Sequence, residues 1–255
     1  MYKSTGKERI APRGTRNRRS RKVNRSRKTT TTTTTTTTYT GLCYDNNGLF
    51  NQVLDSRSAE FPNNTDGFGM AALVGNAWLE YKSMDLPDHA PNVRSWISMA
   101  TAAKPRMFMA HLRSNTRDGM ESTTAHTHPY VIHGKRKTVS VLMNGYVGYT
   151  KLRDNITDTQ YLAEKICARV NAKNEPLGKT VDSILRATRE KFRMTLGVVV
   201  TEPGKSPKHY VVRGMNWDTD PPTLYHSVRA GIYASETLYD GGDWNIVPAV
   251  RFKRE

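Results

Sequence analysis

From position 42 onward, apolar residues gather in short runs that are separated by polar turns. Several of these runs are almost continuously apolar, which is typical of strands covered on both faces. The pattern predicts strands at 68–74, 107–112, 138–143, 196–201, 209–213, 231–235 and 246–252.

The middle of the chain instead shows apolar residues at helical spacing. One helix is predicted from Asp158, a residue suited to an N-cap, to about residue 171. A second is predicted over residues 180–192, where Val181, Ile184, Leu185 and Phe192 recur on one face. Strands on both sides of a helical middle indicate an α+β fold, with sheets packed together and helices outside.

The first 42 residues differ from the rest of the chain in composition and charge. They hold 12 of the 39 Lys and Arg residues and one of the 23 acids, so they carry +11 of the net charge of +16. Ten threonines follow at 29–38. We expect a disordered basic arm and tether over residues 1–42, followed by a folded domain over residues 43–255. The bases are Arg13, Arg16, Arg18, Arg19, Arg21, Lys22, Arg25, Arg27 and Lys28.

Three interpretations of this arm stay open. It is a solvated tail, a segment that binds nucleic acid through phosphates over residues 1–28, or an organelle transit peptide. The third is disfavoured because Ile10 and Val23 are nearly its only aliphatic residues, so no amphipathic helix forms.

Composition narrows the class of protein. With 36% hydrophobic residues among 255, the chain has enough apolar material for a core. No run of about 18 apolar residues predicts a membrane span, and no apolar segment near the start predicts a secretory signal. Two cysteines do not make a disulfide scaffold. We therefore expect an intracellular, cytoplasmic protein without membrane association, with nuclear or organellar targeting by the arm left open.

Polar clusters stand where predicted strands end, at 63–69, 110–116 with 126–130, 143–146 and 157–159. Each alone has a simple explanation: Asn144-Gly145 is a strong hairpin-turn signal, and Cys43 is a small hydrophobe. The histidines at 111, 126, 128 and 133 lack an HExxH or CxxC frame, so we expect neither a metal nor another cofactor.

Taken in order, the clusters resemble the glutaminase domain of class II glutamine amidotransferases. Ala234–Leu238 followed by Trp244 is similar to the C-terminal segment of that family. The resemblance covers residues 43–255 and implies the N-terminal-nucleophile hydrolase fold, a four-layer αββα sandwich. The motifs that carry it are Cys43, Asp66-Gly67-Phe68-Gly69, Ala110-His111-Leu112-Arg113, Thr127-His128-Pro129-Tyr130, Asn144-Gly145 and Asp158-Thr159.

The resemblance also implies a mechanism. Cys43 is the nucleophile, and its own α-amino group, with a pKa of about 7.7–8.0, is the base. The thiolate attacks the side-chain amide of glutamine, and a γ-glutamyl thioester is then hydrolysed. The Asn144 side chain and the Gly145 backbone N–H hold the oxyanion.

Glutamine is a zwitterion, so the resemblance assigns one fixed charge to each of its ends. Arg113 binds the α-carboxylate and Asp158 the ammonium group. Thr116 and His128 stand at positions of supporting pocket residues. L-glutamine is thus the expected substrate.

Two positions depart from the family pattern. Met143 stands where the family has histidine, and Cys43 is not at position 2, so the Leu42–Cys43 bond must be cut to free its amine. Some members of the family cleave off a propeptide, and the resemblance therefore implies that residues 1–42 are such a propeptide if the bond is cut. With that bond cut, we expect the glutaminase half of an amidotransferase that supplies ammonia to a separate acceptor synthase. The alternative is an inactive member of the fold that serves as a nucleic-acid-associated or structural component through its arm.

Overall fold

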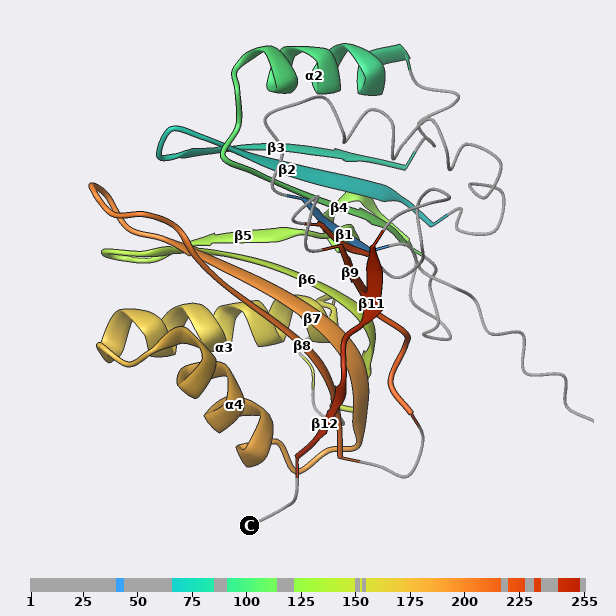
Figure 1. The fold of residues 1–255 in the computed structure, drawn as a ribbon, viewed down its shortest axis with the longest axis vertical. Coiled ribbons are helices and arrows are strands. Elements are labelled where there is room, and N and C mark those ends of the chain that lie inside the picture. The colour runs from blue at the N-terminus through green and yellow to red at the C-terminus, as the bar shows by residue number, and fades with distance from the viewer. Residues whose placement is uncertain are drawn as a thin grey trace, which may run out of the picture. The chain divides into compact units, whose positions relative to one another are not determined.

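The structure is a computed structural model that describes residues 40–43, 66–84, 91–113, 122–149, 152, 155–216, 220–227, 232–234 and 243–252. All of them lie in one compact unit, residues 36–255. Two β-sheets lie between helices in this unit (Figure 1).

The first sheet is antiparallel throughout, in the order β11-β9-β10-β1-β4-β2-β3. Its strands are β1 (Thr40–Cys43), β2 (Phe68–Val74), β3 (Ala77–Ser83), β4 (Met107–Leu112), β9 (Tyr225–Ser227), β10 (Ile232–Ala234) and β11 (Trp244–Ile246). Helix α2 (Pro91–Ala102) packs on its outer face through Val93, Ile97 and Ala100.

The second sheet has the order β12-β8-β7-β6-β5, and only the β12–β8 pair is parallel. Its strands are β5 (Tyr130–His133), β6 (Thr138–Val147), β7 (Phe192–Thr201), β8 (Lys208–Met215) and β12 (Ala249–Arg251). Helices α3 (Asp158–Ala172) and α4 (Leu177–Ala187) cover its outer face, and a short 3₁₀ helix, η2 (Thr124–His126), precedes β5.

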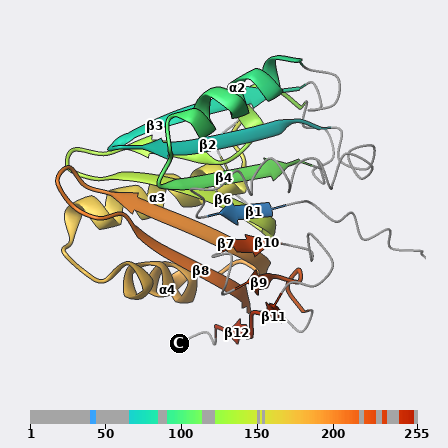
Figure 2. The same cartoon turned by 45° about the horizontal axis from the view of Figure 1, so that its top comes forward.

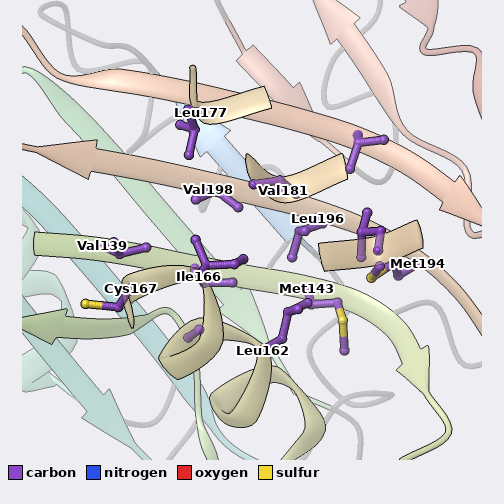
Figure 3. Close-up of a cluster of buried hydrophobic side chains, with 14 of the residues drawn as sticks. Val139, Met143, Leu162, Ile166, Cys167, Leu177, Val181, Met194, Leu196 and Val198 are labelled. Atoms are coloured by element: carbon purple, nitrogen blue, oxygen red, sulfur yellow. The ribbon is translucent and has the colours of Figure 1, made fainter. Parts of the chain in front are cut away.

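The alternation of side chains along the strands builds three apolar clusters. On β6 and β7 one set of alternate residues packs against α3 and α4 (Figure 3). The other set includes Leu142 and Val199, which meet Leu73, Met107 and Met109 of the first sheet. The layers therefore follow one another as α2, first sheet, second sheet, and α3 with α4 (Figure 1). The strand order of the first sheet, from β3 to β11, can be followed in Figure 2. This is the predicted αββα sandwich.

Several predicted boundaries need correction. β1 begins at Thr40, inside the segment predicted as a tether. The second helix ends at Ala187, and Phe192 instead opens β7, where its ring packs 5.9 Å from that of Phe252. The N-cap of α3 is Thr157, whose hydroxyl accepts a hydrogen bond from the Gln160 N–H at 3.0 Å.

Other differences concern whole elements. The run at 246–252 divides into β11 and β12, which belong to different sheets. β3, α2 and β5 were not among the predicted elements. No helix within the described ranges is long and apolar enough to cross a membrane.

Candidate active site

Arg113 follows β4 and is buried, with 6% of its surface exposed. Its backbone is tied to the start of β2, because its N–H donates to Gly67 O at 2.8 Å and its carbonyl accepts from Asp66 N–H at 3.1 Å. Nη1 donates to Ser122 Oγ at 2.8 Å and to Asp66 O at 3.3 Å. Among the described residues no carboxylate lies within 4.0 Å of this guanidinium. A buried charge without such a partner is costly unless a ligand supplies one.

Asp158 is within electrostatic reach of Arg113 without forming an ion pair with it. Burial lowers the pKa of Arg113, while the charges of Tyr130, Asp66 and Asp158 oppose that shift. Arginine nevertheless stays protonated in proteins. One fixed cation and one carboxylate therefore share this region.

The position of Asp158 is fixed by its hydrogen bonds. Oδ2 accepts from the Val147 N–H at 2.8 Å, and Oδ1 accepts from the Thr159 N–H at 2.8 Å. Burial raises the pKa of this carboxyl, and these hydrogen bonds oppose the rise. Because a carboxylate has about four lone-pair sites, it can still accept from a ligand ammonium group. The start of α3 is thereby held to the end of β6.

Asn144 and Gly145 lie inside β6, so the hairpin-turn interpretation is wrong. Asn144 is 5% exposed and pairs with Thr195 of β7. It stands two residues after Leu142, so both lie on the face of β6 that is turned toward the first sheet. Gly145 has φ +110°, and a Cβ there would overlap the carbonyl oxygen of Arg193. Only glycine fits this combination of backbone angle and close approach.

Two buried imidazoles lie beside each other in the same part of the fold. The ring centroids of His111 and His128 are 3.5 Å apart, and Tyr130 stacks on His128 at 5.9 Å. Both nitrogens of His111 and Nδ1 of His128 are buried without a hydrogen-bond partner among the described residues. Burial lowers the pKa of His111 well below its usual value and that of His128 to about 3. Both rings are therefore neutral at neutral pH.

Tyr130 and Ser122 were not assigned a role from the sequence. The Thr157 hydroxyl donates to Tyr130 Oη at 2.9 Å, and burial raises the pKa of Tyr130 to about 12. The Lys82 ammonium lies 4.6 Å from the centre of the tyrosine ring. Tyr130 belongs to the Thr127–Tyr130 motif, so the sequence offered a reason to single it out. Ser122 stands outside every motif.

The glycines of the Asp66–Gly69 motif allow another motif to approach β2. A Cβ at Gly69 would overlap the carbonyl oxygen of His128, and one at Gly67 would overlap the Thr127 side chain. Two motifs that are far apart in the sequence are therefore packed together because these positions lack side chains.

The structure thus brings Arg113, His128, Asp158 and the strand that carries Asn144-Gly145 into one region. It does not bring the backbone of Cys43 there, because that residue pairs with Phe108 at the far end of β4 from Arg113. Thr116, the nine arm bases and residues 235–238 lie outside the described residues. Cys167 is buried on α3, where its Sγ donates to Ile132 O at 3.5 Å. Within the described part of the chain, no group of three metal-ligating side chains was found.

Comparisons with known proteins bear on this fold. No protein-family profile matches the sequence, and a comparison with curated protein sequences gives no match. One similar solved structure is described as the allosteric regulatory enzyme of purine biosynthesis, with a TM-score of 0.59 and 15% sequence identity. Another is glutamine phosphoribosylpyrophosphate (PRPP) amidotransferase from B. subtilis complexed with ADP and GMP, with a TM-score of 0.52 and 13% identity.

This chain has the N-terminal-nucleophile hydrolase fold. Both alignments cover 83% of this chain and 45% of the other, so the chain spans less than half the length of these two proteins. The predicted architecture, a four-layer αββα sandwich, is therefore confirmed. Since one fold hosts many activities, function must be argued from the site.

Proposed function

We propose that this protein is the glutaminase half of a glutamine amidotransferase. It would hydrolyse the side-chain amide of L-glutamine and supply the ammonia to an acceptor enzyme on a separate chain. The observation that carries the proposal is the buried Arg113 guanidinium, which has no carboxylate partner among the described residues and lies within electrostatic reach of Asp158. An α-carboxylate and an α-ammonium group of one amino acid complement that pair of charges.

The remaining groups supply parts of an amide hydrolysis. A nucleophile on β1 attacks the amide carbon, and the Asn144 side chain with the Gly145 N–H binds the oxyanion that develops. Ammonia leaves with the proton taken from the nucleophile. Water then hydrolyses the acyl-enzyme to glutamate and restores the nucleophile.

The two similar solved structures support the acceptor part of the proposal. One of them is by description a glutamine PRPP amidotransferase, and its chain is about twice as long as the aligned region. The residues described in this chain form one αββα unit only. The partner that we propose for the ammonia is a separate synthase.

The test is ammonia release from L-glutamine by the purified full-length protein, compared with an Arg113→Ala variant. Loss of a buried charge-assisted contact of about 2–3 kcal/mol predicts a fall in kcat/KM of about 30- to 150-fold, mostly through KM. Arg106→Ala is the matched control, since the Arg106 side chain lies on the exposed surface, where Nη1 donates to Gly75 O at 3.4 Å. An unchanged kcat/KM in Arg113→Ala, or wild-type protein that releases no ammonia, would contradict the proposal.

A second candidate function rests on the uneven charge. Residues 1–42 carry +11 and the remaining residues +5 of the total. A nucleic-acid-associated role for the arm is compatible with either an active or an inactive site, and it makes a separate prediction about salt.

A further inference from the structure

The register of β1 decides which of its residues lies near the candidate site. Thr40 pairs with His111 and Cys43 pairs with Phe108, so β1 runs away from the Arg113 end of β4. With about 3.4 Å per residue, position 43 lies about 17 Å along the ladder from Arg113, and position 40 about 7 Å. β1 therefore approaches the site with its first residue.

The faces of the sheet lead to the same conclusion. Residues directly opposite each other in an antiparallel ladder occupy the same face, and successive residues alternate. Phe108 packs with α2, whereas Met109 packs with the second sheet. Position 43 therefore belongs to the face that α2 covers. Position 40 belongs to the face turned toward Asn144 and the second sheet.

His111 gives an independent reason to single out position 40. Its imidazole is 2% exposed, and both ring nitrogens lack a hydrogen-bond partner among the residues that the structure describes. A neutral imidazole offers one donor and one acceptor, and a buried one is normally satisfied. The residue that the ladder places opposite it carries a hydroxyl group.

We infer that Thr40, rather than Cys43, is the nucleophile of the proposed glutaminase reaction, with His111, its partner in the β1–β4 ladder, as a positioning residue. This inference rests on the proposed function and changes its covalent intermediate from a thioester to an ester. It also moves the required cut from the Leu42–Cys43 bond to the Tyr39–Thr40 bond.

The chemistry balances with water as the only co-reactant. Hydrolysis of the Tyr39–Thr40 peptide bond gives a carboxylate on Tyr39 and a free α-amine on Thr40. That amine takes the proton of its own hydroxyl as Oγ attacks the amide carbon of glutamine. The C–N bond breaks, and ammonia leaves with the proton. A water molecule then hydrolyses the γ-glutamyl ester to glutamate and restores the hydroxyl.

The experiment uses the full chain with four variants: Thr40→Ala, Thr40→Ser, Cys43→Ala and Thr38→Ala. Removing the nucleophile of a hydrolase lowers kcat by about 10³-fold or more. We therefore expect kcat to fall by about 10³-fold or more in Thr40→Ala. Thr40→Ser should stay within about tenfold of wild type, because it keeps the hydroxyl and the amine. Cys43→Ala and the neighbouring control Thr38→Ala should stay within about twofold of wild type.

Intact mass and covalent labelling give readouts that do not depend on turnover. We expect a mature N-terminus at Thr40 in wild type and Cys43→Ala, and no such cut in Thr40→Ala. A glutamine analogue with a diazoketone in place of its amide should alkylate residue 40: its diazo carbon takes up a proton, and the Thr40 oxygen bonds to that carbon as N₂ leaves. Peptide mass spectrometry maps the adduct. This mapping is done on wild-type protein, so a misfolded variant does not affect it.

The outcomes separate this inference from the proposed function. Turnover that survives Thr40→Ala, an adduct on Cys43, or a cut before Cys43 overturns the inference and leaves the glutaminase proposal standing. A cut before Thr40 in protein that releases no ammonia from glutamine overturns the glutaminase proposal and, with it, the role of Thr40 in that reaction. Absence of cut, adduct and ammonia together overturns both.

Discussion

The adjacent buried imidazoles of His111 and His128 are the residues whose protonation should limit stability in acid. Their folded-state pKa values are lowered by burial, His128 to about 3, from a usual value of 6.5. The unfolded chain therefore binds more protons than the folded one below about pH 6.5. The stability that these neutral rings allow is present above that pH and is lost as pH falls toward 3.

Thermal unfolding between pH 7.5 and 4 measures this effect. We expect the melting temperature to fall with pH in wild type and to fall less steeply in His128→Asn, which has no titrating ring. His133→Asn is the control, because His133 is exposed and bonds only Thr138 at 3.2 Å in the described structure. Equal slopes in wild type and His128→Asn would show that the buried ring does not control the acid response.

At the scale of elements, β6 carries a conformation that only glycine tolerates. In Gly145→Ala the new methyl group would meet the backbone of Arg193 and Met194 at φ +110°. Positive φ and overpacking together predict a loss of about 2–4 kcal/mol in the free energy of unfolding. Urea denaturation measures it.

The matched control is Gly75→Ala in the turn between β2 and β3. Gly75 also has positive φ, +59°, but a Cβ there meets nothing within 4 Å. We expect a loss of only about 1 kcal/mol for this variant. Equal losses in both variants would mean that the approach of β7 to Gly145 contributes nothing.

The elements also show what the sequence can and cannot predict. Continuous apolar runs such as 68–74 and 107–112 were predicted at their observed bounds, because buried strands need apolar residues on both faces. β3 was missed because Glu80 and Lys82 interrupt its apolar pattern. The second helix was predicted too long, since Phe192 fits helical spacing and yet belongs to the next strand.

The candidate site was predicted unevenly for a related reason. Arg113, Asn144 and Asp158 were singled out by motif. In the structure Arg113 follows β4, Asn144 lies within β6, and Asp158 opens α3. The pairing of β1 with β4 could not be predicted, because register depends on long-range contacts and a slip of one residue exchanges the faces. Cys43 was assigned as nucleophile through the family resemblance, which rests on residue types and their order and carries no information on that register.

At the scale of the whole molecule, the charge distribution makes a prediction that is independent of the site. If the nine arm bases each neutralise a phosphate of duplex DNA, the slope of log K against log salt reaches about −8. Replacing all nine by glutamine should remove most of that slope in the full chain. Filter binding or fluorescence anisotropy at several salt concentrations measures it.

The control exchanges every arginine of the same nine positions for lysine. This variant keeps the charge of residues 1–42 at +11 and should keep the slope of wild type. If the variant with nine glutamines in the arm binds DNA with an unchanged slope, the folded domain and not the arm binds DNA. That result would contradict the second candidate function.

The place of β1 in its sheet has a consequence for synthesis on the ribosome. β1 lies between β4 and β10, and β10 is formed by residues 232–234 near the end of the chain. A nascent polypeptide that stops short of residue 232 therefore leaves one edge of β1 without its native neighbour. β1 therefore gains both of its neighbouring strands only after residue 234 has left the ribosome, so translation itself delays any cleavage that requires the completed sheet.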